Sequence, residues 1–526
     1  MSNRHLYLTL LALVAFQAEV RPSTPTPRHT PQLVVNIAID QLRTDCLEAF
    51  APLFSDNGFK RLMSQGMVFV NASYPFTPVD RASAIASIST GTTPYYNSIV
   101  GNQWLNRETL RPTGCVDNPK YTGMLTAETA APTSITSSTI GDELKIATGG
   151  RSLVYAIAPN REAAVLSAGH AADAALWIDN IYGEWCSSMY YMKSVPLWLQ
   201  AHNRSKGPCR IIQDAVWEPL NDLTANYNFY LQEANETPFK HKFTGDTRFT
   251  EYKESGLVNA TVTDMALQCI NVTGMGSDKV ADLLSLTYYA GKFGHRRATE
   301  CQMELQDTYV RLDRELGRLM DSTYQAVGKN AVLFVVTSTG YDAVENIDYT
   351  SFNVPTGNFY MGRTAGLVNM YLAAIWGQGN YVEATFRNQL FLNHKLLETK
   401  KISISDATTR SQEVIALMSG VRHVYTSLQL LTSQSPLSEK ARNGFNPQRC
   451  GDLLIEVAPG WNIHNEDSHQ SEVSLASVTQ FPIIICGEGI TPERILTPVT
   501  TDRIAPTIAH SIRIRAPNAC STEPLF

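Results

Sequence analysis

Several features that mark particular classes of protein are scarce or missing in this sequence. Its 43 Lys and Arg are outnumbered by 49 Asp and Glu, so the net charge is −6. Nucleic-acid-binding proteins usually carry a basic excess, and no nucleic-acid partner is expected. The nine cysteines form no CxxC pair, and no internal repeat is present. With 44% hydrophobic and 17% charged residues, the composition excludes a wholly disordered, collagenous or coiled-coil protein.

Long apolar runs are also missing after the N-terminal segment, so no transmembrane span is predicted there. The N-terminal segment itself has Arg4, an apolar run over residues 6–16 and then Ala18. This pattern predicts a signal peptide over residues 1–20, followed by a Pro-rich leader over 21–31. We therefore expect export, where some cysteines can oxidise, although an odd number leaves at least one without an intramolecular partner.

The remaining chain alternates between buried-strand and helix patterns. Residues 33–40 (LVVNIAID) form an apolar, β-branched run that ends in Asp40. Such a run is typical of a strand buried on both faces, and the carboxyl ends of such strands hold the sites of open α/β sheets. Residues 301–327 have the 3.6-residue apolar spacing of a long helix. Further strands are expected at 152–158, 282–289, 331–338 and 481–487, the last of which places Cys486 in the core.

This alternation predicts a doubly wound α/β domain with a mostly parallel sheet flanked by helices. We expect it to span residues 32–526. Two stretches lack the strand–helix rhythm and are predicted to be cap insertions, at about 188–275 and about 345–475.

Eight phrases, in order along the chain, resemble the alkaline phosphatase superfamily. The similarity is closest to the phosphate-irrepressible alkaline phosphatases of Bacteroidota, and nucleotide pyrophosphatase/phosphodiesterases are more distant relatives. It implies an alkaline phosphatase-like fold and a place in the periplasm or outer envelope of a Gram-negative bacterium. The phrases are IAIDQLRTD (37–45), NGFKRLMSQGMVFVNASYPF (57–76), ASISTGTTPYYNSIVGNQW (86–104), GDELKIATGGRS (141–152), SAGHAADAALWID (167–179), DTYVRLDREL (307–316), FPIIICGEGI (481–490) and DRIAPTIAHSIRIRAPNAC (502–520).

The resemblance implies in-line phosphoryl transfer by two zinc ions and a Thr or Ser nucleophile at a helix N-terminus. The family's nucleophile segment is represented here by TPVDRASAIAS (77–87), which places Arg81 at the nucleophile position. A guanidinium cannot attack phosphorus. Of six expected metal ligands only Asp40 is kept. The other five positions are Thr287, Gly291, Thr339, Gly340 and Gln480, all poor zinc ligands or none.

The substrate side is partly kept. Asn102 matches the family's phosphate-contacting Asn, and Arg161 matches its Arg, while Pro159 stands at the position of a Lys. Each retained residue has an alternative structural interpretation, as a turn residue for Asn102 and as a solvated charge for Arg161. His170 matches a position outside the metal set and is interpreted as structural.

Two expectations about the altered site follow. Arg81 should pair with Asp40, because an unpaired buried charge is costly, and Asp80 should cap the same helix. Substitute nucleophiles at Thr77 or Ser83 would have no metal to lower their pKa. The stretch HNEDSH (464–469) offers His464, Asp467 and His469, but short polar runs of this kind are usually solvated loops.

Three functions remain open at this point. The first is an exported, catalytically inactive pseudophosphatase that binds an anionic small ligand or an envelope protein, with no cofactor. The second is an active phosphomonoester or phosphodiester hydrolase with a rebuilt site, the only case in which zinc is expected. The third is a purely structural envelope protein.

Overall fold

The structure is a computed structural model that describes residues 30–227, 238–295, 301–341, 349–467, 470–473 and 479–526. The predicted signal peptide and most of the Pro-rich leader lie outside the described residues. Within the described residues, none of the helices combines the length and the apolar character needed to cross a membrane.

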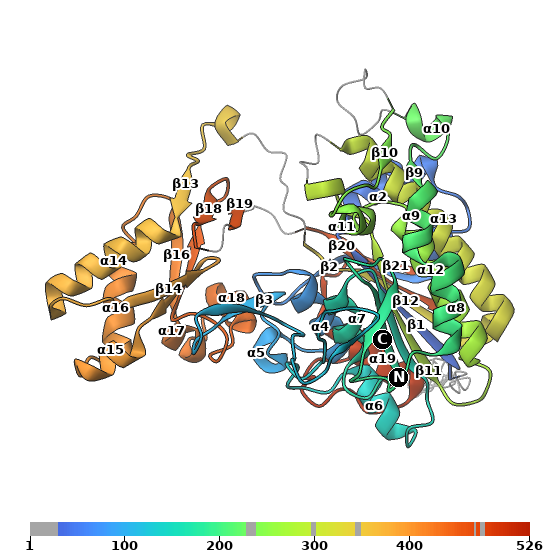
Figure 1. Cartoon of the computed structure of the whole chain (residues 1–526), viewed down its shortest axis with the longest axis horizontal. Helices are drawn as coiled ribbons and strands as arrows, with labels where there is room; N and C mark the ends of the chain where they lie inside the picture. The colour runs from blue at the N-terminus through green and yellow to red at the C-terminus, as the bar shows by residue number, and fades with distance from the viewer. Residues whose placement is uncertain (1–29, 228–237, 296–300, 342–348, 468–469, 474–478) are drawn as a thin grey trace, which may run out of the picture.

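A large central sheet organises the main body of the molecule (Figure 1). Four of the five strands expected from the sequence match within a residue, and β6 begins two residues later than expected. Across the described part of the sheet the order is β21 (Glu493–Ile495), β2 (Met67–Ser73), β20 (Phe481–Gly487), β12 (Val332–Ser338), β1 (Leu33–Asp40), β11 (Asp282–Tyr289), β6 (Val154–Ala158), β7 (Ala174–Ile178), β8 (Trp185–Ser188) and β5 (Gly123–Met124), with β22 (Val499–Thr500) also pairing with β2.

The sheet is mostly parallel, as predicted, with one informative exception. Strand β1 pairs in parallel with both β11 and β12, and β6 and β7 continue in the same direction. Strand β20, predicted from the sequence without a direction, runs antiparallel to both of its neighbours, β12 and β2. An unbroken apolar run reports burial on both faces and carries no information about strand direction.

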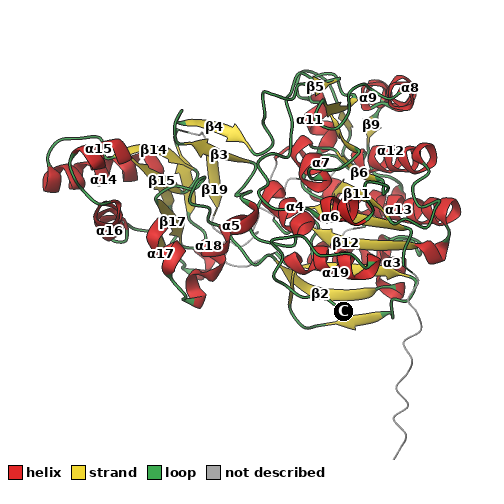
Figure 2. Ribbon diagram, turned by 90° about the horizontal axis from the view of Figure 1, so that it is seen from below, coloured by secondary structure: helices red, strands yellow, loops and turns green. Residues whose placement is uncertain are grey.

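Helices cover both faces of the sheet (Figure 2). Leu33, Val35 and Ile37 of β1 pack into one core cluster, whereas Val34 and Ala38 pack into the other, as the two-residue period of a strand requires. The first cluster is covered by α2 (Thr44–Phe50), α3 (Phe59–Gln65), α12 (Val258–Thr273) and α13 (Gln302–Val327), and the second by α4 (Arg81–Thr90), α6 (Ile140–Ala147), α7 (Arg161–Ala168) and α19 (Ile504–Ile512).

Two regions depart from the strand–helix alternation. Between β8 and β11 the chain forms α8 (Leu197–Lys206), α9 (Pro208–Asp214), β9 (Val216–Trp217), α10 (Asp222–Ala225), β10 (His241–Lys242), α11 (Arg248–Lys253) and α12. The other region, residues 358–473, extends to one side of the main body and is called the cap below (Figure 1). Its described strands are β13 (Asn358–Tyr360), β14 (Val382–Phe386), β15 (Gln389–Leu392), β16 (Val421–Thr426), β17 (Leu453–Val457), β18 (Asn462–Asn465) and β19 (Gln470–Val473), with helices α14 (Met361–Trp376), α15 (His394–Thr399), α16 (Ile404–Ile415), α17 (Ser427–Thr432) and α18 (Glu439–Gly444).

Candidate functional site

The candidate site lies where β1 ends and α4 begins. Asp40 is the last residue of β1, and Arg81 is the first residue of α4. The helix starts here because Asp80 and Ser83 form a capping box, in which the Asp80 carboxylate accepts from the Ser83 backbone N–H at 3.0 Å. This confirms the predicted cap.

The predicted ion pair between Arg81 and Asp40 is also present. The Nε of Arg81 donates to Oδ2 of Asp40 at 2.7 Å, and its Nη1 donates to Oε1 of Glu162 at 2.8 Å. Glu162 is the second residue of α7 and was missed by the sequence analysis. Its only signal was an acidic residue in the first turn of a helix, which is common for reasons of the helix dipole alone.

Charge–charge interactions keep both Arg81 and Glu162 ionised. Burial opposes the charged forms of both side chains, but the charge of Asp40, with smaller effects from Tyr341 and Glu162, raises the pKa of Arg81 well above its ordinary value. Burial also opposes ionisation of Glu162, yet the Arg81 charge and hydrogen bond lower its pKa. Arg81 is therefore a permanent cation held between carboxylates.

Both carboxylate oxygens of Asp40 accept hydrogen bonds from protein groups. Asp40 is only 1% exposed, and its Oδ1 accepts from the Thr339 hydroxyl at 2.8 Å. Its Oδ2 accepts from Arg81 and, more weakly at 3.4 Å, from the Tyr341 hydroxyl. The retained carboxylate thus has protein donors at both oxygens.

Neighbouring side chains lie close to two of the positions predicted for metal ligands, Gly291 and Gly340. A Cβ added to Gly291 would lie 2.7 Å from both the Gln41 side chain and the Tyr289 hydroxyl. A Cβ at Gly340, where φ is +67°, would lie 2.5 Å from Phe481 and 2.6 Å from Tyr74. At Gly340 the positive φ and the two rings favour glycine, whereas a side chain at position 291 would require the ends of the Gln41 and Tyr289 side chains to move.

The other three positions offer no zinc ligand either. Thr287 is buried on β11 beside Ala38 of β1, and Thr339 binds Asp40. Gln480 has an exposed side chain, and its backbone carbonyl accepts from the N–H of Thr44 at 3.0 Å. Among the described residues, no group of three or more His, Cys, Asp or Glu is arranged to hold a metal ion. The described residues at this edge of the sheet do not fit a zinc centre.

Comparison with known proteins agrees with this fold. The profile of the type I phosphodiesterase / nucleotide pyrophosphatase family matches residues 34–479, which is most of the chain. The chain belongs to this family.

Among its relatives in the family are a calcium-transporting ATPase of Myroides odoratus and alkaline phosphatase PafA of Elizabethkingia meningoseptica. The chain is 28% identical to the first and 26% identical to the second, and each alignment covers 94% of both proteins. The crystal structure of PafA superposes with a TM-score of 0.82 at 25% identity, covering 95% of this chain and 99% of PafA. The alkaline phosphatase-like α/β fold inferred from the sequence is thereby confirmed.

Asn102 and Arg161, the two residues predicted to match the family's phosphate side, both have protein partners. The Asn102 side-chain oxygen accepts from the N–H of Ala82 at 3.1 Å, and so closes the first turn of α4. Arg161 donates to the Asp117 carboxylate at 2.7 Å and to the Thr129 carbonyl at 2.8 Å. Both therefore have a structural role here, whatever ligand role they also have.

Arg387 of the cap contacts this site. Arg387, in the turn between β14 and β15, donates to Oδ2 of Asp80 at 3.1 Å, and the N–H of Asn102 donates to the same oxygen at 2.7 Å. Asp80 thus joins α4, the Asn102 turn and the cap.

A buried lysine behind Glu162 was not anticipated from the sequence. Lys253, at the end of α11, is 5% exposed, and its ammonium donates to the Ile178 carbonyl at 3.4 Å. Burial lowers its pKa, while the nearby charge of Glu162 opposes that shift. The lysine comes from the region between β8 and β11, where no sequence pattern linked it to the site.

The remaining candidates do not converge on this site. In the HNEDSH stretch, the His464 ring contacts the Asn358 side chain at 2.9 Å, Asp467 accepts from the Thr385 hydroxyl at 2.8 Å, and His469 lies outside the described residues. His170 binds the Asp142 carboxylate at 3.0 Å, as expected of a structural residue. Thr77 is exposed.

Proposed function

We propose that this protein is an exported, non-hydrolysing member of the family that serves as a binding protein in the cell envelope. The observation that carries the proposal is the guanidinium of Arg81, which stands at the nucleophile position and is bonded to Asp40 and Glu162. A permanent cation cannot act as a nucleophile, and its two carboxylate partners are already bonded to it and cannot act as metal ligands or general bases.

The nearest hydroxyl on α4 does not replace the lost nucleophile. Ser83 is fully buried, and its hydroxyl lies within the capping box, 3.0 Å from Oδ1 and 3.1 Å from the carbonyl oxygen of Asp80. A buried hydroxyl committed to a helix cap has neither access to a substrate nor a base that activates it.

A ligand for the altered site would be anionic. The donors near this site are Asn102, Arg161 and Arg387, and each has N–H groups beyond those that its protein contacts use. Phosphate, sulfate and carboxylate groups are recognised by such donors. A protein partner with an exposed acidic side chain would use the same chemistry.

A second candidate function is hydrolysis of phosphate esters at a rebuilt site. Similarity to named members of the family favours it. The family profile spans most of the chain, and PafA is named an alkaline phosphatase. The two functions differ in their dependence on Asp40 and on zinc.

Assay of the purified protein on aryl phosphate mono- and diesters, with and without added Zn²⁺, separates them. PafA in the same assay is the positive control, and elemental analysis measures bound metal. We expect no turnover above background and no stoichiometric zinc. Stoichiometric zinc together with turnover that Asp40→Ala abolishes would overturn the proposal.

Thermal unfolding in phosphate or sulfate tests the binding role, because a ligand that binds only the folded state raises the midpoint. We expect a rise that Asn102→Ala and Arg161→Ala each reduce. No rise with either anion, and no envelope protein captured by the immobilised chain, would favour a purely structural role. Edman sequencing of the protein from a periplasmic fraction tests export, since a mature N-terminus near residue 20 is expected.

A further inference from the structure

A separate cavity lies at the other end of the central sheet. It has a volume of about 270 Å³ and is lined by the end of α3, the end of α13, the turn before β12 and the end of β20. Because β1 and β12 are parallel, the start of β12 and the Asp40 end of β1 lie at opposite edges of the sheet. The cavity is therefore distinct from the site around Arg81.

The floor of the cavity is neutral. Cys486 is only 4% exposed, and its thiol is hydrogen-bonded to the Tyr324 hydroxyl. Burial raises the pKa of Cys486 and raises that of Tyr324 to about 12, so both groups are protonated at neutral pH. Arg61 lies over the Tyr324 ring at 5.3 Å, and its charge is paired with Asp321.

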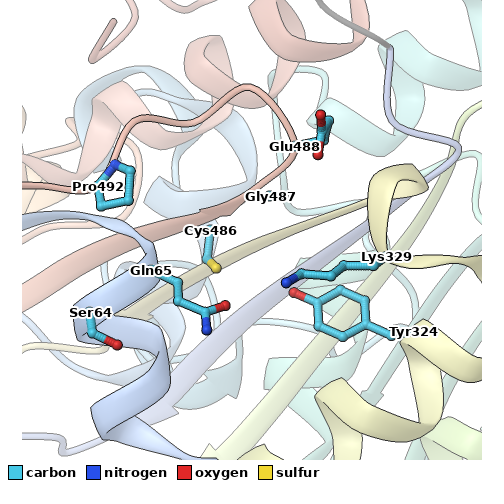
Figure 3. Close-up of a pocket in the computed structure, with 8 residues that line it drawn as sticks. All are labelled: Ser64, Gln65, Tyr324, Lys329, Cys486, Gly487, Glu488 and Pro492. Atoms are coloured by element: carbon cyan, nitrogen blue, oxygen red, sulfur yellow. The ribbon is translucent and has the colours of Figure 1, made fainter.

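The walls carry groups of both charges that lack protein partners. In the part of the chain that the structure describes, the side chains of Gln65, Lys329 and Glu488 make no hydrogen bond or ion pair. Figure 3 shows these residues around one space, with Gln65 on α3 facing Lys329. Lys329 and Glu488, both exposed to solvent, thus line one cavity without pairing with each other.

We propose that this cavity binds a small zwitterion of the amino-acid type. The ligand's carboxylate would face the Lys329 ammonium and the Gln65 amide, and its ammonium group would face the Glu488 carboxylate. A ligand with both charges satisfies both walls at once, which a simple anion or cation does not. The volume also suits a small metabolite, because pockets for drug-sized ligands begin at roughly 300 Å³.

Calorimetric titration of the full chain with L-alanine, L-serine and L-valine tests this proposal. Propionate and ethylammonium, which each carry one of the two charges, are the comparison ligands. We expect saturable binding of the amino acids and about tenfold weaker binding, or none, of the single-charge compounds, because one charge-assisted contact is lost. Lys329→Gln and Glu488→Gln should each weaken amino-acid binding about tenfold for the same reason.

The matched controls are Lys279→Gln and Glu108→Gln, which remove exposed charges outside the cavity and should leave binding unchanged. All four changes are at exposed residues, so folding is not at issue. Absence of amino-acid binding would overturn the proposal, as would binding that survives both cavity variants. Equal binding of propionate would also overturn it, because Lys329 would then be a simple anion site. None of these outcomes depends on whether the Arg81 site hydrolyses or binds anything.

Discussion

The two halves of the candidate site are held in place in different ways. In the metal half, which comprises Asp40, Arg81 and the positions predicted for metal ligands, Arg81 neutralises Asp40, and neighbouring side chains lie close to Gly291 and Gly340. In the phosphate half, Asn102 and Arg161 bond to nearby protein groups. The difference follows burial. A buried carboxylate that loses its cation must be neutralised, whereas partly exposed polar groups remain hydrated when a ligand is lost.

The largest expected effect tests the metal half. Arg81→Ala leaves the nearly inaccessible Asp40 and the partly buried Glu162 without their cation, and removing one partner of a buried ion pair typically costs about 3–5 kcal/mol. We expect a loss of that order in the free energy of unfolding, measured by urea denaturation. The matched control is Arg161→Ala, which breaks a more exposed pair and should cost about 1 kcal/mol or less.

A double variant sharpens that result. Arg81→Ala combined with Asp40→Asn removes the uncompensated charge along with the cation, so it should recover part of the stability lost in Arg81→Ala. If the double variant is less stable than Arg81→Ala alone, the buried charge of Asp40 is not the source of the loss.

An intermediate effect is expected on the phosphate half. Asn102→Ala removes the acceptor for the N–H of Ala82, and loss of such a helix-terminal acceptor costs about 1–2 kcal/mol. Urea denaturation again provides the measurement. Asn118→Ala, which removes a surface contact to Thr133, is the control and should cost about 0.5 kcal/mol or less. Equal costs for the two variants would show that Asn102 has no special structural role.

The smallest effect concerns His170, which lies outside both halves. The hydrogen bond to Asp142 raises the pKa of His170 against the opposing effect of burial. Burial would raise the pKa of Asp142, but the His170 hydrogen bond, with backbone contacts, lowers it. The His170 contribution to stability is therefore fully present below its unfolded pKa of about 6.5 and is lost as pH rises through its folded value. The Asp142 contribution is present above its unfolded pKa of about 4 and is lost as pH falls.

Thermal midpoints of the wild type and His170→Gln between about pH 5 and about pH 9 test this pair. The wild type should be the more stable near pH 5, and the difference should shrink as pH rises. A difference that grows with pH would mean that the neutral imidazole, and not the imidazolium, stabilises this contact.

The sequence allowed the central strands and half of the Arg81 contacts to be predicted, for identifiable reasons. Unbroken apolar runs predicted β1, β11 and β20. The family resemblance placed Arg81 at the nucleophile position near the end of β1, and the cost of a buried unpaired charge then predicted its pair with Asp40. The direction of β20 was not predicted, because apolar runs do not encode strand direction. Glu162, Lys253 and Tyr341 were missed because their contacts with the site are set by tertiary distance, and no local spacing reports that distance.

The placement of Arg81 also bears on how this protein can change in evolution. Replacing Arg81 with a hydroxyl residue would leave the Asp40 and Glu162 carboxylates without their cation. A histidine or aspartate at position 340 would require Phe481 and Tyr74 to move, and one at position 291 would require the ends of the Gln41 and Tyr289 side chains to move. We expect each of these changes alone to lower the stability of the fold. A metal-dependent site could therefore evolve here only through several substitutions made together.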